Sequence, residues 1–136
     1  MFTSPYEQYR STQIETASPE KLLIMLYDAA IGALNSARVA IASKRREEAN
    51  RSFQKTQAII TELQGSLEPG AGEVAKNLFA LYDYFNRRLI EANLKQDQTA
   101  LEEVLEHLKD LRSAWKQASV MNASAGRPTS LANVGG

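Results

Sequence analysis

The side chains that could carry acid–base or metal chemistry lie together in one short stretch of the 136-residue chain. The only histidine, His107, stands among four carboxylates, at Glu102, Glu103, Glu106 and Asp110. An imidazole beside a carboxylate is a common arrangement for proton transfer, and a di-iron site in a helical bundle needs two Glu-x-x-His motifs. A single histidine cannot provide those motifs, and a solvated helix face accounts for the carboxylates more simply.

Outside this stretch, the candidates for catalysis are Asp83 and Tyr84, and the sequence identifies no partner for either. The chain contains no glycine-rich phosphate loop, no dinucleotide-binding fingerprint, no nucleophile elbow and no HExxH motif. It also lacks cysteine, which excludes disulfides, thiolate catalysis and cysteine-ligated metals. We therefore predict a protein that is not an enzyme and that uses no metal and no cofactor.

The charge of the chain argues against nucleic acid as its main partner. The sequence has 16 basic and 16 acidic residues and a formal net charge of zero, whereas binding to nucleic acid depends on a basic surface. A basic cluster at Lys44-Arg45-Arg46, with Arg51 and Lys55, keeps a weak nucleic-acid hypothesis open. A solvated face with internal charge pairs is the simpler interpretation, so we predict no nucleic-acid partner.

The sequence shows no sign of export or membrane insertion. Its N-terminus lacks the basic segment and the apolar segment that a secretory signal would have. The absence of cysteine suits the reducing cytoplasm. The longest apolar run is broken at Asp28, and we expect it to be too short to cross a bilayer. These features predict a cytoplasmic protein.

Apolar residues recur at helical spacing along the chain, and no segment shows the alternation of a strand. Ser18 and Pro19 are typical of a helix start, and either Asp97 or Thr99, the latter opening a capping box, can begin the last helix. Long helices with short connections predict an all-α, antiparallel up-down four-helix bundle. The predicted parts are an N-terminal arm over 1–17, a bundle over 18–118 with helices at about 19–42, 46–66, 73–94 and 98–118, and a flexible tail over 119–136.

The first predicted helix has more apolar surface than one core face requires. A broad apolar arc, which includes Leu22 and Ala29, suits close packing against neighbouring helices. The polar residues form one narrow line, made of Lys21, Asp28 and Asn35. Three apolar residues lie outside the arc: Ile24 and Ile31 beside the polar line, and Tyr27 further round. This surplus predicts that the helix binds a partner.

Apolar residues also lie outside the predicted core elsewhere in the chain. Phe79 and Ile90 share the far side of the third helix, while Phe2, Tyr6 and Tyr9 share one face of the arm. Singly exposed apolar residues are normal on a surface, but a shared aromatic face gains little unless it covers apolar surface. We expect the arm to fold back over the spare surface, either competing with a partner or clamping it. A simple cap on the core is the alternative.

Several of these segments resemble the FliS family of flagellar export chaperones. The matching segments are Thr16-Ala17-Ser18-Pro19-Glu20-Lys21-Leu22, Met25 to Ala30, Leu81-Tyr82-Asp83-Tyr84, Leu89 to Asn93, and Leu111 to Trp115. They follow the family's order and spacing over roughly residues 6–117, and the tail lies outside the match. One departure is Ala29, where the family usually has glycine.

The resemblance implies a cytoplasmic bundle that holds the disordered C-terminal segment of flagellin, prevents early polymerisation and assists delivery to the flagellar type III export apparatus. It also implies an export-gate component as a partner, and some relatives bind an anti-sigma factor. The alternative is a helical regulatory module that self-associates through the same surplus surface, and a weak homodimer is compatible with both. The flagellin-binding residues that we expect are Tyr6, Tyr9, Ile24, Tyr27, Ile31, Phe79 and Ile90.

Overall fold

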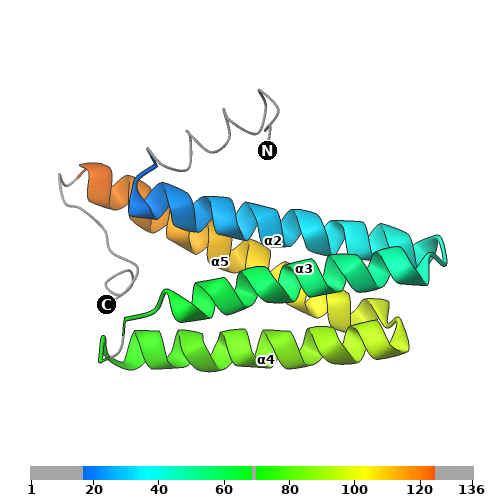
Figure 1. Cartoon of the computed structure of the whole chain (residues 1–136). Coiled ribbons are helices and arrows are strands. Elements are labelled where there is room, and N and C mark those ends of the chain that lie inside the picture. Colours follow the sequence, from blue (N-terminus) through cyan, green and yellow to red (C-terminus); the bar gives the residue numbers. More distant parts are fainter. Residues whose placement is uncertain (1–16, 69, 125–136) are drawn as a thin grey trace, which may run out of the picture.

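The computed structural model describes residues 17–68 and 70–124, and every regular element within these ranges is a helix (Figure 1). The helices are α2 (Pro19–Ala42), α3 (Arg46–Gly65), α4 (Glu73–Lys95) and α5 (Gln98–Ser124). They follow one another through short connections and run alternately up and down. The predicted all-α, antiparallel four-helix bundle is therefore confirmed.

The four helices occupy the corners of the bundle. Helix α2 packs mainly against α3 and α5, and α4 packs mainly against the same two helices. Helices α2 and α4 therefore stand at opposite corners. In Figure 1, α2, α3 and α4 succeed one another down the front of the view, while α5 crosses behind them. The outer sides of α2 and α4 consequently face away from each other.

Two side chains, those of Ser18 and Asp97, cap helix starts that the sequence analysis predicted. The Ser18 side chain accepts a hydrogen bond from the Lys21 backbone N–H at 3.2 Å, and Pro19 begins α2. Asp97 caps α5, since its Oδ1 accepts a hydrogen bond from the Thr99 backbone N–H at 2.8 Å. The capping box predicted to open at Thr99 is wrong, because Thr99 already lies inside α5.

Helix α5 is longer than the sequence predicted. It continues to Ser124, so residues 119–124, which were assigned to a flexible tail, are helical. These residues include no glycine and no proline, the first glycine being Gly126. Adding residues to an existing helix is much easier than starting one, so a Ser- and Ala-rich continuation does not end the helix. The rest of the predicted tail and nearly all of the predicted arm lie outside the described residues.

Helix α2 has a length and composition that would also suit a membrane span, and it is the one described helix that does. This corrects the expectation that its apolar run is too short. The core helix of a soluble bundle has the same properties, and one face of α2 is buried in the bundle core. Its polar line makes contacts too: Arg112 of α5 donates from Nη2 to Asp28 Oδ2 at 3.3 Å.

The core holds one group of hydrogen-bonded polar side chains. Tyr27 of α2 and Tyr82 of α4 bond through their hydroxyls at 2.5 Å, and Trp115 of α5 donates its indole N–H to the Tyr27 hydroxyl at 3.1 Å. All three side chains are buried, and Tyr27 has no exposed surface. The sequence placed Tyr27 outside the packing arc of α2, among the flagellin-binding candidates. Its predicted exposure is wrong, because its bond to Tyr82 joins opposite corners through the middle of the bundle.

Replacing Tyr27 should destabilise the bundle more than replacing Tyr82. Tyr27→Phe removes the partner of both Trp115 and Tyr82 and leaves two buried groups unbonded, at a cost of about 3 kcal/mol. Tyr82→Phe leaves the bond from Trp115 to Tyr27 in place and should cost about 1 kcal/mol. Urea unfolding of the two variants measures the difference. Equal losses would show that Tyr27 is not the centre of this group.

Folding stability should fall in alkali because burial raises the pKa of both Tyr27 and Tyr82 above the ordinary value of 10.0. The two tyrosines make their full contribution to the free energy of unfolding below about pH 10. This contribution is lost as pH rises, because the unfolded chain then releases phenolic protons that the folded chain keeps. Each tyrosine should remove about 1.4 kcal/mol per pH unit above that point. The comparison with Tyr82→Phe isolates the contribution of one tyrosine. Urea unfolding between about pH 9 and pH 11 should show a shallower fall of the unfolding free energy for that variant.

Candidate functional site

Two large exposed apolar side chains, Phe79 and Ile90, lie on the outer side of α4, and we call them the α4 outer face. Leu94, one turn beyond Ile90, is exposed as well, but its carbonyl oxygen accepts a hydrogen bond from Arg46 at the start of α3. Asn86, which lies between Phe79 and Ile90 on the same side of the helix, donates from Nδ2 to Oγ1 of Thr61 in α3 at 3.2 Å. Polar contacts thus hold α4 against α3 at this edge, and the apolar side chains beside them remain open to solvent.

A depression of about 370 Å³ lies next to Phe79, where α3 ends and α4 begins. Leu67, Ala75 and Phe79 provide apolar parts of its lining. The connection between the two helices turns through Gly70 and Gly72, whose φ angles are +77° and +100°, a conformation that favours glycine. A hollow beside an exposed aromatic ring can receive an apolar side chain of a docking segment. We call it the hairpin depression.

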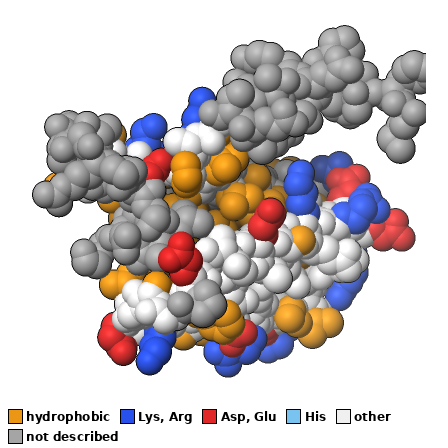
Figure 2. Space-filling model, turned by 60° about the vertical axis from the view of Figure 1, so that its left-hand side comes forward, with side chains coloured by type: hydrophobic (Ala, Val, Ile, Leu, Met, Phe, Trp, Pro, Cys, Tyr) orange, Lys and Arg blue, Asp and Glu red, His pale blue; other side chains and the backbone are white. Residues whose placement is uncertain are grey.

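A second apolar surface runs along the outer side of α2. Its residues recur at spacings of three and four, and each is half-buried or exposed. We call them the α2 outer stripe: Leu22, Met25, Ala29, Gly32 and Ser36. A side chain added at Gly32 would meet no neighbouring atom within 4 Å, so another backbone can approach closely there. Figure 2 shows hydrophobic side chains gathered in the upper part of the molecule, at the height of α2.

The candidates for flagellin binding that lie within the described residues belong to two helices, α2 and α4. Phe79 and Ile90 are exposed, by 54% and 48%, as the sequence predicted. Tyr6 and Tyr9 lie outside the described residues. The α2 and α4 candidates are not brought together, because they belong to helices at opposite corners. The structure therefore does not bring the α2 and α4 candidates into one groove.

Two of the α2 candidates are corrected by the structure. Ile24 and Tyr27 are core residues, with 9% and 0% exposure, and Ile31 is half-buried against the core. The cause is that Asp28, in the polar line of α2, pairs with Arg112 of α5, so this part of the line lies at the edge of α2 next to α5. Ile24 and Ile31 flank that line, so they lie toward α5 and the core. A helical wheel of α2 alone places the polar line toward solvent, because it contains no information about the neighbouring helix α5.

The α2 outer stripe was missed for the same reason. Leu22 and Ala29 belonged to the arc expected to pack against other helices, yet both are half-buried at the surface. The sequence analysis did not identify Gly32 or Ser36 as part of a binding surface. The available signal was the run of small residues along α2, which permits close approach of another helix but does not say from which side.

The candidates for catalysis form a structural network between α4 and α5. Arg88 donates from Nε to Glu103 Oε1 at 2.8 Å, and the Tyr84 hydroxyl donates to Oε2 of the same carboxylate. These hydrogen bonds, that of Tyr84 first, hold the pKa of the Glu103 carboxyl below its ordinary value. Glu103 is therefore ionised at neutral pH and is a poor proton acceptor. The His107 ring packs against Phe85, with ring centroids 5.5 Å apart.

Asp83, the remaining acidic candidate for catalysis, also makes a structural contact. Asp83 pairs with Arg87 one turn away, at 3.5 Å. Within residues 17–68 and 70–124, no group of three or more His, Cys, Asp or Glu side chains could hold a metal ion. These polar clusters hold neighbouring parts of the helices together.

Comparison with known proteins finds relatives over most of the chain. The family described as "Flagellar protein FliS" matches residues 2–122. The flagellar secretion chaperone FliS of Bacillus subtilis is 38% identical over 115 residues, which cover 85% of this chain and 86% of the relative. That of Salmonella typhimurium is 38% identical over 126 residues, covering 88% and 93%. That of Escherichia coli is 36% identical over 107 residues, covering 77% and 79%.

A charge introduced at Ile24 should unfold the bundle, while the same charge at Phe79 should not. Ile24→Asp buries an unpaired carboxylate in the core and should cost about 3 kcal/mol. Phe79→Asp changes a side chain that is half in solvent and should cost less than about 1 kcal/mol. Thermal and urea unfolding of the two variants test this. A stable Ile24→Asp variant would return Ile24 to the list of surface candidates.

Proposed function

This chain belongs to the FliS family of flagellar secretion chaperones, and on that premise we propose that it binds the C-terminal segment of flagellin in the cytoplasm. Flagellin held in this way does not polymerise early and can be delivered to the flagellar type III export apparatus. An export-gate component and an anti-sigma factor are further proposed partners. The flagellin-binding residues that remain in this proposal are Tyr6, Tyr9, Ile31, Phe79 and Ile90.

The observation that carries the proposal is the α4 outer face beside the hairpin depression. The core side of α4 is already filled by Tyr82, Phe85 and Leu89, so the exposed Phe79 and Ile90 are surplus to folding. Covering apolar surface contributes roughly 25 cal/mol per Å². A flagellin segment with apolar side chains at helical spacing would gain that energy by docking there.

The positions of the two apolar surfaces constrain how such a client binds. The α4 outer face and the α2 outer stripe lie at opposite corners of the bundle. A segment that contacts both must pass around the bundle, across α3 or α5. We therefore propose a one-to-one complex in which an extended client becomes helical where it meets each apolar surface.

The N-terminal arm is the second part of the proposal. Tyr6 and Tyr9 are expected to cover spare apolar surface, and the α2 outer stripe supplies such a surface. In one version the arm competes with flagellin for that surface and must move. In the other version it closes over bound flagellin as a clamp. Both versions assign the arm to the same place and differ in the sign of its effect on affinity.

Self-association through the same apolar faces is the alternative function. A regulatory module of this kind would be a stable dimer without flagellin, because its own partner would cover the α4 outer face. A chaperone awaiting its client would be mainly monomeric and at most weakly dimeric. Light scattering of the purified chain across a range of concentrations distinguishes the two.

The flagellin segment should bind with heat release and a gain in helicity. Calorimetry with a synthetic peptide of the C-terminal segment of the same cell's flagellin should give one site, and circular dichroism should show more helix in the mixture than in the separate components. Phe79→Asp should weaken this binding about tenfold, which corresponds to about 1.4 kcal/mol. No heat and no helicity gain at micromolar concentration would refute the proposal.

Val120 provides a matched control for the charge introduced at Phe79. Its side chain is 57% exposed, close to the 54% of Phe79, and it lies near the end of α5, outside both the α4 outer face and the α2 outer stripe. Val120→Asp should change the affinity for the peptide by less than about twofold. Equal weakening by both variants would indicate a general effect of charge and would remove Phe79 from the site.

A further inference from the structure

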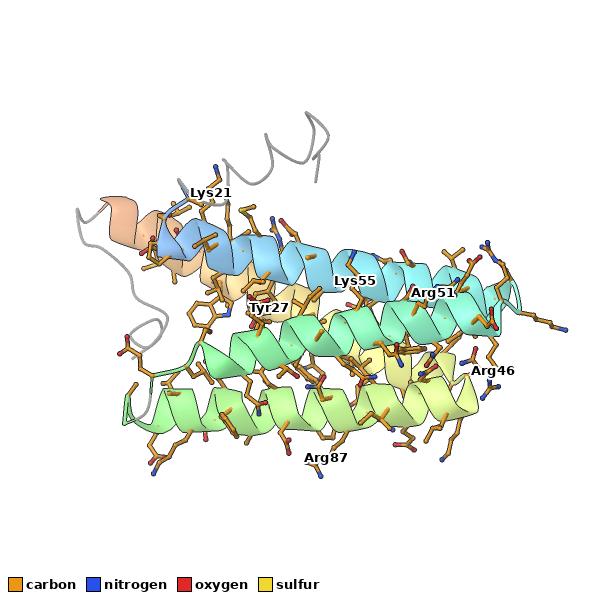
Figure 3. All side chains as sticks on the ribbon, viewed as in Figure 1. Lys21, Tyr27, Arg46, Arg51, Lys55 and Arg87 are labelled. Carbon is orange, nitrogen blue, oxygen red and sulfur yellow. The ribbon has the colours of Figure 1, made fainter. Side chains whose placement is uncertain are left out.

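The basic side chains without an ionic partner are gathered at one end of the bundle. Within residues 17–68 and 70–124, six Lys or Arg side chains form no ion pair, and four of them fall between positions 44 and 55. These four are Lys44, Arg46, Arg51 and Lys55. Figure 3 shows three of them along the first half of α3, at the end of the bundle away from Lys21. In a chain of zero net charge, this is a local excess of positive charge.

Three arginines of this region line one depression of about 360 Å³ at the start of α3. We call it the arginine depression, and its lining is Arg45, Arg46, Glu47, Glu48 and Arg51. Arg45 is positioned by Glu48, with Nη1 and Oε2 2.9 Å apart. Arg46 donates from Nη2 to the backbone carbonyl oxygen of Leu94, also at 2.9 Å. Two of the three guanidinium groups are therefore held in place.

Positioned guanidinium groups recognise oxyanions, because each presents a planar fork that matches a carboxylate or a phosphate. The lining also contains Glu47 and Glu48, so the positive surface is short, whereas a nucleic-acid backbone needs a longer basic surface. None of the described residues in the lining is aromatic, so none can stack on a base. The arginine depression therefore suits a short acidic stretch of protein better than nucleic acid.

The position of Lys44 adds to this argument. Its φ angle is 57°, in the left-handed region that glycine usually occupies after a helix. The conformation closes the end of α2, because the N–H groups of Lys44 and Arg45 donate to the carbonyl oxygens of Ile41 and Ala40 at 3.0 and 2.8 Å. The Lys44 side chain forms no ion pair with any described residue, so it adds a positive charge next to the three arginines.

We propose that the arginine depression binds an acidic segment of a second partner protein, at a site separate from the one proposed for flagellin. The hairpin depression adjoins the other end of α3, and a helix of 20 residues separates the two by about 30 Å. Both sites can therefore be occupied at once. The chain would then contact its second partner while it still holds its client.

The test uses the full chain and a fluorescein-labelled hexaglutamate peptide as the probe. At about 50 mM salt the peptide should bind, and the affinity should fall steeply by about 300 mM as screening grows. Replacing both unpaired arginines, in R46Q/R51Q, should weaken binding about tenfold. The single variant Arg51→Gln, which alters no contact with the rest of the bundle, should weaken it in the same direction. A thermal melt of each variant shows whether it is folded.

The matched control removes the same charge elsewhere. Lys21 and Lys116 are the other two cations without an ion pair in the described ranges, and K21Q/K116Q should leave the affinity within about twofold. Saturating flagellin peptide should also leave it unchanged, and failure of that peptide to bind would not affect this test. No binding of hexaglutamate by the native chain, or equal weakening in the control, would overturn the proposal. Tighter binding of a labelled duplex oligonucleotide than of hexaglutamate would assign the site to nucleic acid instead.

Discussion

The hydrogen bond between Tyr27 and Tyr82 is the constraint on which the rest of this bundle depends. It links α2 to α4 across the diagonal, and Trp115 brings α5 into the same group. Apolar faces of helices can slide along each other by one turn with little loss of burial, but a buried hydroxyl that loses its partner is costly. Three of the four helices are therefore held in a single register by one small polar group.

That register decides which side of α2 is left for a partner. With Tyr27 in the centre, one edge of α2 meets α5, where Asp28 pairs with Arg112 and Arg38 with Glu102. Buried alanines on the other side allow α2 and α3 to lie close together. The side that remains is the α2 outer stripe, whose side chains are mostly apolar or small. The apolar surplus of α2 thus becomes an exposed surface because both of its other sides are used.

The two ends of α3 differ in chemistry, and this difference separates the proposed sites. The end at Gly65 adjoins a hollow with Leu67, Ala75 and Phe79 in its lining, which suits an apolar side chain. The end at Arg46 carries fixed guanidinium groups, which suit carboxylates. An apolar contact is nearly independent of salt, while an exposed ionic contact weakens with it. One helix can therefore serve two partners that respond differently to conditions.

The sequence by itself determined the helices, their order and the class of protein. Helical spacing, the cap at Ser18 and the segments shared with the FliS family are local or family-level signals, and each was sufficient for its purpose. Exposure of Phe79 and Ile90 was also predictable, because both lie opposite a well-defined core face. Only the tertiary structure decided that Ile24 and Tyr27 are buried and that Leu22 and Ala29 line the surface. A helix that is apolar nearly all round has no unique inside, so its orientation is set by the neighbours that pair with its few polar groups.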